Sequence, residues 1–183
     1  MTPSYEEALA LHGRYGSGSV LVKHCVTVAS VASVIAGAFE RSGVSLDRGA
    51  VTAGALLHDI GRNRTHTVAH GVEGAAILEK EGVDAKVVEI VRRHVGAGLS
   101  KEEAKKLGLP EFDYVPRSLE ERIVCFADKM VGSDLVRPFK EEVDRYARKG
   151  HDVKKLVALK EGIRKELGQD PERLVLDNIK ESQ

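Results

Sequence analysis

The chain of 183 residues has no tryptophan, two methionines and two cysteines, and aromatic residues make up 4% of it. Cys25 and Cys125 form no C-x-x-C pair, which excludes a disulfide-rich or zinc-ribbon scaffold. We expect both to be free, buried thiols of a cytoplasmic protein. Asparagine and glutamine occur twice each, against 28 Lys plus Arg and 28 Asp plus Glu, a bias that favours a heat-adapted source.

Neither positive nor negative charge predominates, because the formal net charge is zero. This excludes broad nucleic-acid or membrane-surface binding, and a charged ligand must be held by local groups. The long apolar run, residues 20–39, is interrupted by Lys23, His24, two serines and a threonine. We interpret it as a buried helix of a water-soluble protein rather than a membrane span, and no apolar signal-peptide core precedes it.

Almost every segment repeats its apolar residues at a period near 3.6, and none alternates convincingly with a period of two. The sequence therefore predicts an all-α fold, and its length suits a single domain over residues 1–183. The predicted helices cover about residues 4–14, 19–41, 47–59, 67–81, 84–95, a short stretch from 100, 118–131, 138–149, 152–167 and a stretch after 171.

The most informative feature is the pair His58-Asp59, inside the run Leu-Leu-His-Asp-Ile-Gly-Arg. At the end of a helix, two adjacent side chains lie about 100° apart and can converge on one ion or on two neighbouring ions. Further candidates lie in or beside apolar helical segments, where an unpaired polar group is costly: His24, His70, His94 and Asp128.

A lone histidine on an apolar face is more often a satisfied structural residue, and a lone buried aspartate is more often a cap or an ion pair. Here several such groups occur together, and few basic residues share their faces. A divalent metal satisfies them all, because imidazole nitrogen and carboxylate oxygen suit Fe, Mn, Zn, Co or Ni, with Mg as a further candidate. The sequence therefore predicts a metal site.

This combination resembles the HD-domain metal-dependent phosphohydrolases, and residues 58–61, His-Asp-Ile-Gly, match the HDIG variant of their signature. The resemblance covers about residues 20–138 and implies an HD-domain helical bundle, to which residues 139–183 add C-terminal helices. An early histidine, the HD pair and a late aspartate hold one metal in that family. By resemblance, these ligands are His24, His58, Asp59 and Asp128.

Family members with a second metal add histidines between the HD pair and the last aspartate. His70 and His94 fit that role, with Asp59 as the bridge, so the resemblance implies two ions per chain. Residues 70–75 and 127–129 are most similar to small uncharacterised archaeal HDIG proteins and to HD-type symmetrical dinucleoside tetraphosphate hydrolases. The latter carry an arginine after the last aspartate, where this chain has Arg137.

The resemblance implies an enzyme that cleaves a phosphoester or phosphoanhydride of a nucleotide or another small phosphate compound with a metal-activated water. Asp59 would be catalytic as the bridge, and Glu73 would either orient a ligand or lie in solvent. We predict that three cations bind the substrate phosphate, although helix ends favour such residues in any case: Arg62, Lys129 and Arg137. We interpret His66 as exposed, and His12 and His151 have no supporting context.

Three alternatives stay open. The first is a single-metal phosphomonoesterase, in which His70 and His94 contact substrate. The second is oxygenation at a di-iron site, which relatives with this bundle perform. The third is a non-catalytic, metal-stabilised module that binds a nucleotide. The charged helices after residue 138 either cap the pocket or form the surface of a homodimer.

Overall fold

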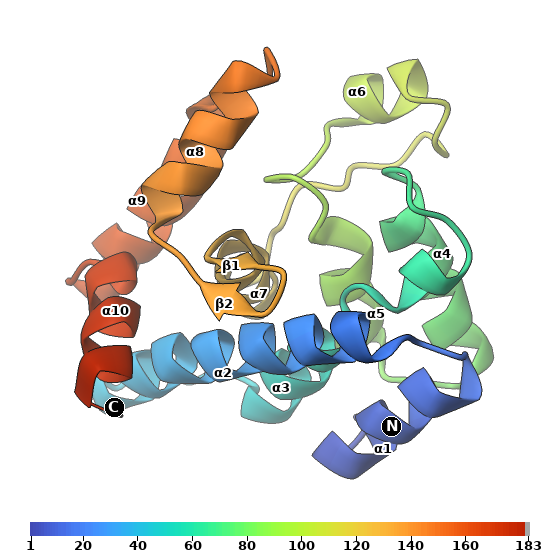
Figure 1. Ribbon diagram of the computed structural model, residues 1–183, viewed down its shortest axis with the longest axis horizontal. Helices are drawn as coiled ribbons and strands as arrows, with labels where there is room; N and C mark the ends of the chain where they lie inside the picture. The colour runs from blue at the N-terminus through green and yellow to red at the C-terminus, as the bar shows by residue number, and fades with distance from the viewer. Residues whose placement is uncertain (182–183) are drawn as a thin grey trace.

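A computed structural model describes residues 1–181. It confirms the all-α prediction (Figure 1). In chain order the elements are α1 (Tyr5–Arg14), α2 (Ser19–Arg41), α3 (Arg48–Leu57), the 3₁₀ helix η1 (Ile60–Asn63), α4 (His70–Lys80), α5 (Ala85–Arg93), α6 (Lys101–Lys106), α7 (Leu119–Lys129), β1 (Val131–Gly132), β2 (Leu135–Val136), α8 (Phe139–Arg148), α9 (Lys154–Leu167) and α10 (Pro171–Glu181).

Periodicity predicted neither the 3₁₀ helix η1 nor the hairpin of β1 and β2. The strands pair antiparallel, Val131 with Val136 and Gly132 with Leu135. Ser133 in the turn has a φ of 53°, in the left-handed region. Strands of two residues are too short to produce an alternating pattern, so the sequence carries no signal for them.

Helix starts follow local capping chemistry. The Asp47 carboxylate accepts a hydrogen bond from the Ala50 amide and begins α3. Ser100 and Glu103 form a reciprocal capping box that begins α6, at the residue where the sequence predicts one. These local signals fix where α3 and α6 begin.

The central helix is α2, which packs against α3 and α7 and also contacts α10 (Figure 1). It is long and apolar enough to cross a membrane by length and composition, yet 44% of its most apolar window is buried inside the protein. Val28, Ile35 and Phe39 are fully buried in the single hydrophobic core. This is the environment of a core helix, as the interrupted apolar run predicts. Cys25 and Cys125 are free and buried, as expected.

After α7 the chain passes through the β1–β2 hairpin into α8, and α9 and α10 bring it back into contact with α7 and α2. Phe139 is the one buried residue of α8 and packs against the Phe126 ring at a centroid distance of 5.0 Å. From there α8 projects away from α2 (Figure 1). Helix α9 buries Leu156 and Ile163, and α10 then packs on α2. Helix α8 is therefore anchored at its first residue and otherwise largely exposed.

Candidate metal centre

The fold brings the six predicted ligands together from five different helices or helix ends. His24 lies on α2, His58 and Asp59 follow α3, His70 begins α4, His94 ends α5, and Asp128 lies in the last turn of α7. Five of them line a cavity of about 1600 Å³, which we call the main cavity: His24, Asp59, His70, His94 and Asp128. His58 lies behind them and is fully buried.

One oxygen of Asp59 faces a first group of ligands. Asp59 Oδ2 lies 3.9 Å from His24 Nε2 and 3.6 Å from His58 Nε2. Asp128 Oδ1 closes the group, at 3.2 Å from His24 Nε2 and 3.5 Å from His58 Nε2. Two imidazoles and two carboxylates thus converge on one point.

The other oxygen of Asp59 faces a second group. Asp59 Oδ1 lies 3.1 Å from His70 Nε2 and 3.3 Å from His94 Nε2, and these two nitrogens are 3.0 Å apart. The ligand atoms of His24, His58 and Asp59 lie within 4.8 Å of one another, as do those of Asp59, His70 and His94, a spacing that could hold a metal ion. Asp59 belongs to both groups, which is the arrangement required of a bridging carboxylate.

All four ring orientations are held by the backbone. His24, His58, His70 and His94 each have Nδ1 2.7–2.8 Å from a carbonyl oxygen, those of Ser133, Ala55, Thr67 and Val91 respectively. A carbonyl only accepts, so each Nδ1 donates the proton, and each Nε2 in the neutral ring directs a lone pair at the centre. Such hydrogen bonds are typical of metal-ligating histidines because they fix both tautomer and orientation.

These side chains fit a bound cation. His58 Nε2 and Asp59 Oδ1 are buried and have no hydrogen-bond partner. Buried polar atoms without partners are costly, and facing lone pairs repel one another. A divalent cation between them satisfies both atoms, and the donor set of imidazole and carboxylate suits transition metals.

The protonation equilibria of the buried ligands also favour a cation at the centre. Burial opposes ionisation of Asp59, but His58, His70 and His94 hold its pKa well below the usual range. Burial lowers the pKa of His58, yet the Asp59 carboxylate outweighs it and raises that pKa well above normal. Burial lowers the pKa of His94 to about 4 despite Asp59, so its ring is neutral and able to ligate at neutral pH.

Two glycines let the segment after the HD pair reach α4. A Cβ on Gly61 would lie 2.0 Å from the His70 carbonyl oxygen and 2.5 Å from the Gly74 amide nitrogen. A Cβ on Gly74 would lie 2.8 Å from the Val91 side chain. Only glycine fits such close backbone approaches, and this contact brings Asp59 to His70.

The three predicted phosphate-binding cations all line the main cavity. Arg62 Nε donates to Asp59 Oδ2 at 2.5 Å, and 34% of its side chain is exposed. Lys129 is buried and pairs with Asp128. Burial opposes the charge on Lys129, but the Asp128 carboxylate raises its pKa above the usual range. Arg137 is exposed beside the hairpin.

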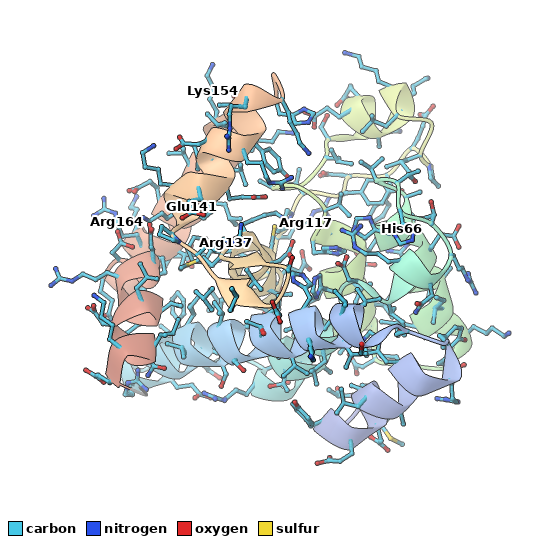
Figure 2. The ribbon with its side chains drawn as sticks, in the orientation of Figure 1. His66, Arg117, Arg137, Glu141, Lys154 and Arg164 are labelled. Atoms are coloured by element: carbon cyan, nitrogen blue, oxygen red, sulfur yellow. The ribbon has the colours of Figure 1, made fainter. Side chains whose placement is uncertain are left out.

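The remaining predicted residues lie further away. Glu73 pairs with Arg64 at 3.0 Å, is 39% exposed and is not among the residues of the main cavity, so it lies in solvent. His66 is exposed, as interpreted, and lines the cavity. Figure 2 shows His66 on the side of α4, with Arg137 and Glu141 opposite, near the hairpin and the start of α8.

Sequence reasoning found no context for His12, which supports the metal centre from behind. Its Nε2 donates to the Leu56 carbonyl oxygen at 2.7 Å, so its Nδ1 accepts from the Ser17 hydroxyl at 2.7 Å. Asn63 donates to the same hydroxyl at 2.7 Å. The buried chain of hydrogen bonds holds the last turn of α3, two residues before His58. The available sequence signal was the apolar residues Ala8 and Leu11, four and one positions before His12; all three are buried.

Comparison with known proteins identifies the family. Residues 21–132, more than half of the chain, match the model of the HD domain. The chain belongs to the HD-domain family. An uncharacterized protein of Methanocaldococcus jannaschii, MJ0778, is 40% identical over 87% of this HD protein and 96% of its own length. The matched HD region includes all six ligands and ends at Gly132, before α8.

Other curated relatives are longer proteins. The tRNA (cytidine(56)-2'-O)-methyltransferase of Picrophilus torridus is 41% identical over 82% of this chain and 43% of its own length. That of Thermoplasma volcanium is 39% identical over 94% of this chain and 50% of its own length. The HD chain thus spans half the length, or less, of these relatives.

A solved structure shares the fold. The HD domain of the L. monocytogenes phosphodiesterase PgpH aligns with a TM-score of 0.59 over 96% of this chain and 99% of that one, at 16% identity. The same domain in complex with cyclic-di-AMP aligns with a TM-score of 0.52 over 87% and 92%, at 17% identity. At this identity the likeness establishes the HD-domain fold.

Proposed function

We propose that this HD protein is a dinuclear, metal-dependent phosphohydrolase. It cleaves a phosphoester or phosphoanhydride of a nucleotide or another small phosphate compound. The observation that carries the proposal is Asp59, whose two oxygens face two separate groups of imidazole ligands at the floor of a wide cavity. A carboxylate shared in this way sets two cations side by side, as in two-metal phosphohydrolases.

In this proposal, His24, His58, Asp59 and Asp128 hold one ion, and Asp59, His70 and His94 hold the other. Bound divalent ions lower the pKa of a coordinated water and stabilise negative charge on a phosphoryl group. The protein contributes fixed ligand orientation through the four Nδ1 hydrogen bonds and a buried floor.

The cations of the chain have separate tasks. Arg62 touches Asp59 and is partly exposed to the cavity, so its guanidinium binds a substrate phosphate beside the bridge. Lys129 balances Asp128 and adds positive charge next to the first ligand group. Arg137, on the opposite wall, is free to contact a more distant phosphate or ribose.

The names of the methyltransferase relatives do not transfer to this chain. The match covers 43–50% of those proteins. Two groups of imidazole and carboxylate ligands suit metal-assisted hydrolysis, for which metal-activated water is the nucleophile. We infer that the matched region is a phosphohydrolase unit, and RNA-derived phosphates belong in any substrate screen.

The test is a hydrolysis screen on nucleotides, dinucleoside polyphosphates, cyclic mono- and dinucleotides and RNA-derived phosphates, with Mn, Fe, Co, Ni and Mg. Metal content is measured in parallel by elemental analysis. We expect two ions per chain and turnover of at least one compound. The matched control is Glu73→Gln, a carboxylate near the centre in sequence but outside the cavity, which should turn over like wild type.

Other results point to other functions. One ion per chain, even after anaerobic reconstitution, with turnover of monoesters alone would identify a single-metal phosphomonoesterase. Iron-dependent oxygen consumption would identify an oxygenase. Full metal occupancy and nucleotide binding without turnover on the whole panel would identify a binding module. Each of these results would overturn the dinuclear phosphohydrolase.

We further propose that residues 1–183 form one domain, with the HD core over about 20–138 and a helical extension over 139–183; residues 182–183 lie outside the described part. The two free, buried thiols support a cytoplasmic location. The charged, exposed face of α8 remains a candidate surface for a homodimer.

A further inference from the structure

A second, smaller cavity opens beside the metal centre. Its volume is about 450 Å³, and we call it the side cavity. It is bounded by the loop after α5, by α6 and by α8 and α9, and its apolar lining includes Val68, Val95, Ala97, Leu99, Leu107 and Leu156. Val68, Val95 and Tyr146 line the main cavity as well, so the two cavities adjoin at these residues.

Tyr146 stands where the two cavities meet. It is half-buried, and it is the one phenylalanine or tyrosine among residues 1–181 that lines either cavity. The Arg145 guanidinium lies 5.2 Å from its ring centroid, and the His151 ring lies 5.6 Å from it. Its hydroxyl lies 3.9 Å from where a Cβ on Gly96 would be. The ring is therefore braced between α8 and the loop that follows His94.

The two cavities differ in the chemistry that they offer. The main cavity presents metal ligands and cations, which suit a phosphate. The side cavity is lined by aliphatic side chains, the Tyr146 ring and charged residues that include the Glu103–Lys155 ion pair, and its larger, apolar part suits a planar, uncharged group. A nucleotide combines both parts in one molecule, and a base stacks favourably on an aromatic side chain whatever its identity.

We propose that the side cavity is a nucleobase subsite, in which the base of the substrate packs against Tyr146 while its phosphate lies at the metal centre. This inference rests on the proposed function and narrows it from phosphate compounds in general to nucleotides. Arg145, which lines both cavities, assists because its guanidinium lies over the ring and helps to hold the tyrosine in place.

The experiment compares ligands with and without a base. Isothermal titration calorimetry on the Mn²⁺-loaded protein gives the Kd of AMP, GMP, CMP, UMP and ribose 5-phosphate, and released phosphate is assayed separately. We expect at least one nucleotide to bind ten-fold or more tighter than ribose 5-phosphate. Tyr146→Ala should bring that nucleotide to within about two-fold of ribose 5-phosphate without changing the Kd of ribose 5-phosphate.

Two further variants distinguish the loss of base stacking from a general loss of folding or binding. Tyr146→Phe keeps the ring and should retain most of the preference for a base. Tyr5→Ala removes a 41% exposed tyrosine on α1 and should change nothing. Equal affinities for every nucleotide and ribose 5-phosphate in wild type would overturn the subsite, as would an equal loss for both ligands in Tyr146→Ala. Base-dependent binding without hydrolysis would support the subsite and reject the proposed function.

Discussion

The main cavity has two unlike walls. On one, the ligands are buried and held: His58, Asp59, His70 and His94 are 0–5% exposed, and every ligand imidazole is hydrogen-bonded to a backbone carbonyl. On the other, α8 buries one residue, Phe139, and presents Arg145, Tyr146 and Arg148 to the cavity. The first wall is built for fixed geometry, and the second holds its side chains by surface contacts such as the Arg145–Glu142 pair rather than by burial.

This difference indicates that the wall with the ligands determines the reaction and that the wall formed by α8 determines which substrate binds. The wall with the ligands lies within the region matched by the HD-domain model, and α8 lies outside it. Loop and peripheral residues commonly set specificity on a scaffold that sets the reaction. The two walls should therefore respond differently to mutation, one by losing metal and the other by losing affinity for substrate.

The largest effect is expected at Asp59, the residue shared by both ligand groups. Losing a supporting neighbour of a metal ligand typically costs 10–100-fold, so Asp59→Ala should lower hydrolysis by more than about 100-fold. Elemental analysis should show that metal is no longer retained. Unchanged metal content in this variant would contradict the bridging role.

Replacing Phe139, the buried residue that anchors α8, should lower the stability of the fold without changing the metal content. Phe139 is 3% exposed, so Phe139→Ala should lower the free energy of unfolding by about 3–5 kcal/mol. Urea denaturation measures this, and elemental analysis of the folded variant should give wild-type metal content. The control is Leu135→Ala, on a side chain that is 64% exposed, with an expected change of less than about 0.5 kcal/mol. Metal loss in Phe139→Ala would show that the walls are not independent.

The buried ligands should make the free energy of unfolding of the chelator-treated protein depend on pH. His94 has a pKa of about 4 against 6.5 for an ordinary histidine, so the fold favours its neutral form. Its contribution is present above pH 6.5 and is lost as the pH falls towards 4, about 3 kcal/mol at most. The raised pKa of His58 adds stability that is fully present below pH 6.5 and declines only as the pH rises above it, so it does not account for a loss on acidification. Urea denaturation at pH 4.5–7 should show the loss, and His94→Gln should flatten it.

His12 should matter to the buried wall although it touches no substrate. His12→Ala leaves the Leu56 carbonyl and the Ser17 hydroxyl without this partner, which costs about 1–3 kcal/mol in the free energy of unfolding. His66→Ala, at an exposed histidine, should stay within about 0.5 kcal/mol. Equal stability of the two variants would remove the supporting role of His12.

The smallest effect is expected at the hairpin. A Cβ on Gly132 would lie 2.7–2.8 Å from the Arg137 guanidinium, which would have to move. Because Arg137 is exposed and flexible, Gly132→Ala should raise KM about two- to five-fold and leave metal content and kcat unchanged. Gly162→Ala, in open space on α9, is the matched control. A fall in kcat at constant KM would argue against phosphate binding by Arg137.

Much of the buried wall could be predicted from the sequence. His24, His94 and Asp128 interrupt apolar helix faces, and such interruptions stand out because an unpaired polar group in a core is costly. The role of His12 could not be predicted, because its helix is short and its hydrogen-bond partners, Leu56 and Ser17, lie outside that helix. The position of Glu73, three residues after His70, left both a ligand-orienting role and a solvated side chain open; in the structure it is partly exposed and pairs with Arg64.

The sequence by itself determined the helical class, the helix starts and the ligand types, because periodicity and capping are local properties of the chain. The tertiary structure decided how the two oxygens of Asp59 divide between two histidine groups, because that depends on the close contact of Gly61 with α4. It also decided where α8 lies, since a hairpin of two-residue strands and one buried phenylalanine direct that helix along the opposite wall of the main cavity. Contacts between distant segments arise from packing, and no local pattern encodes them.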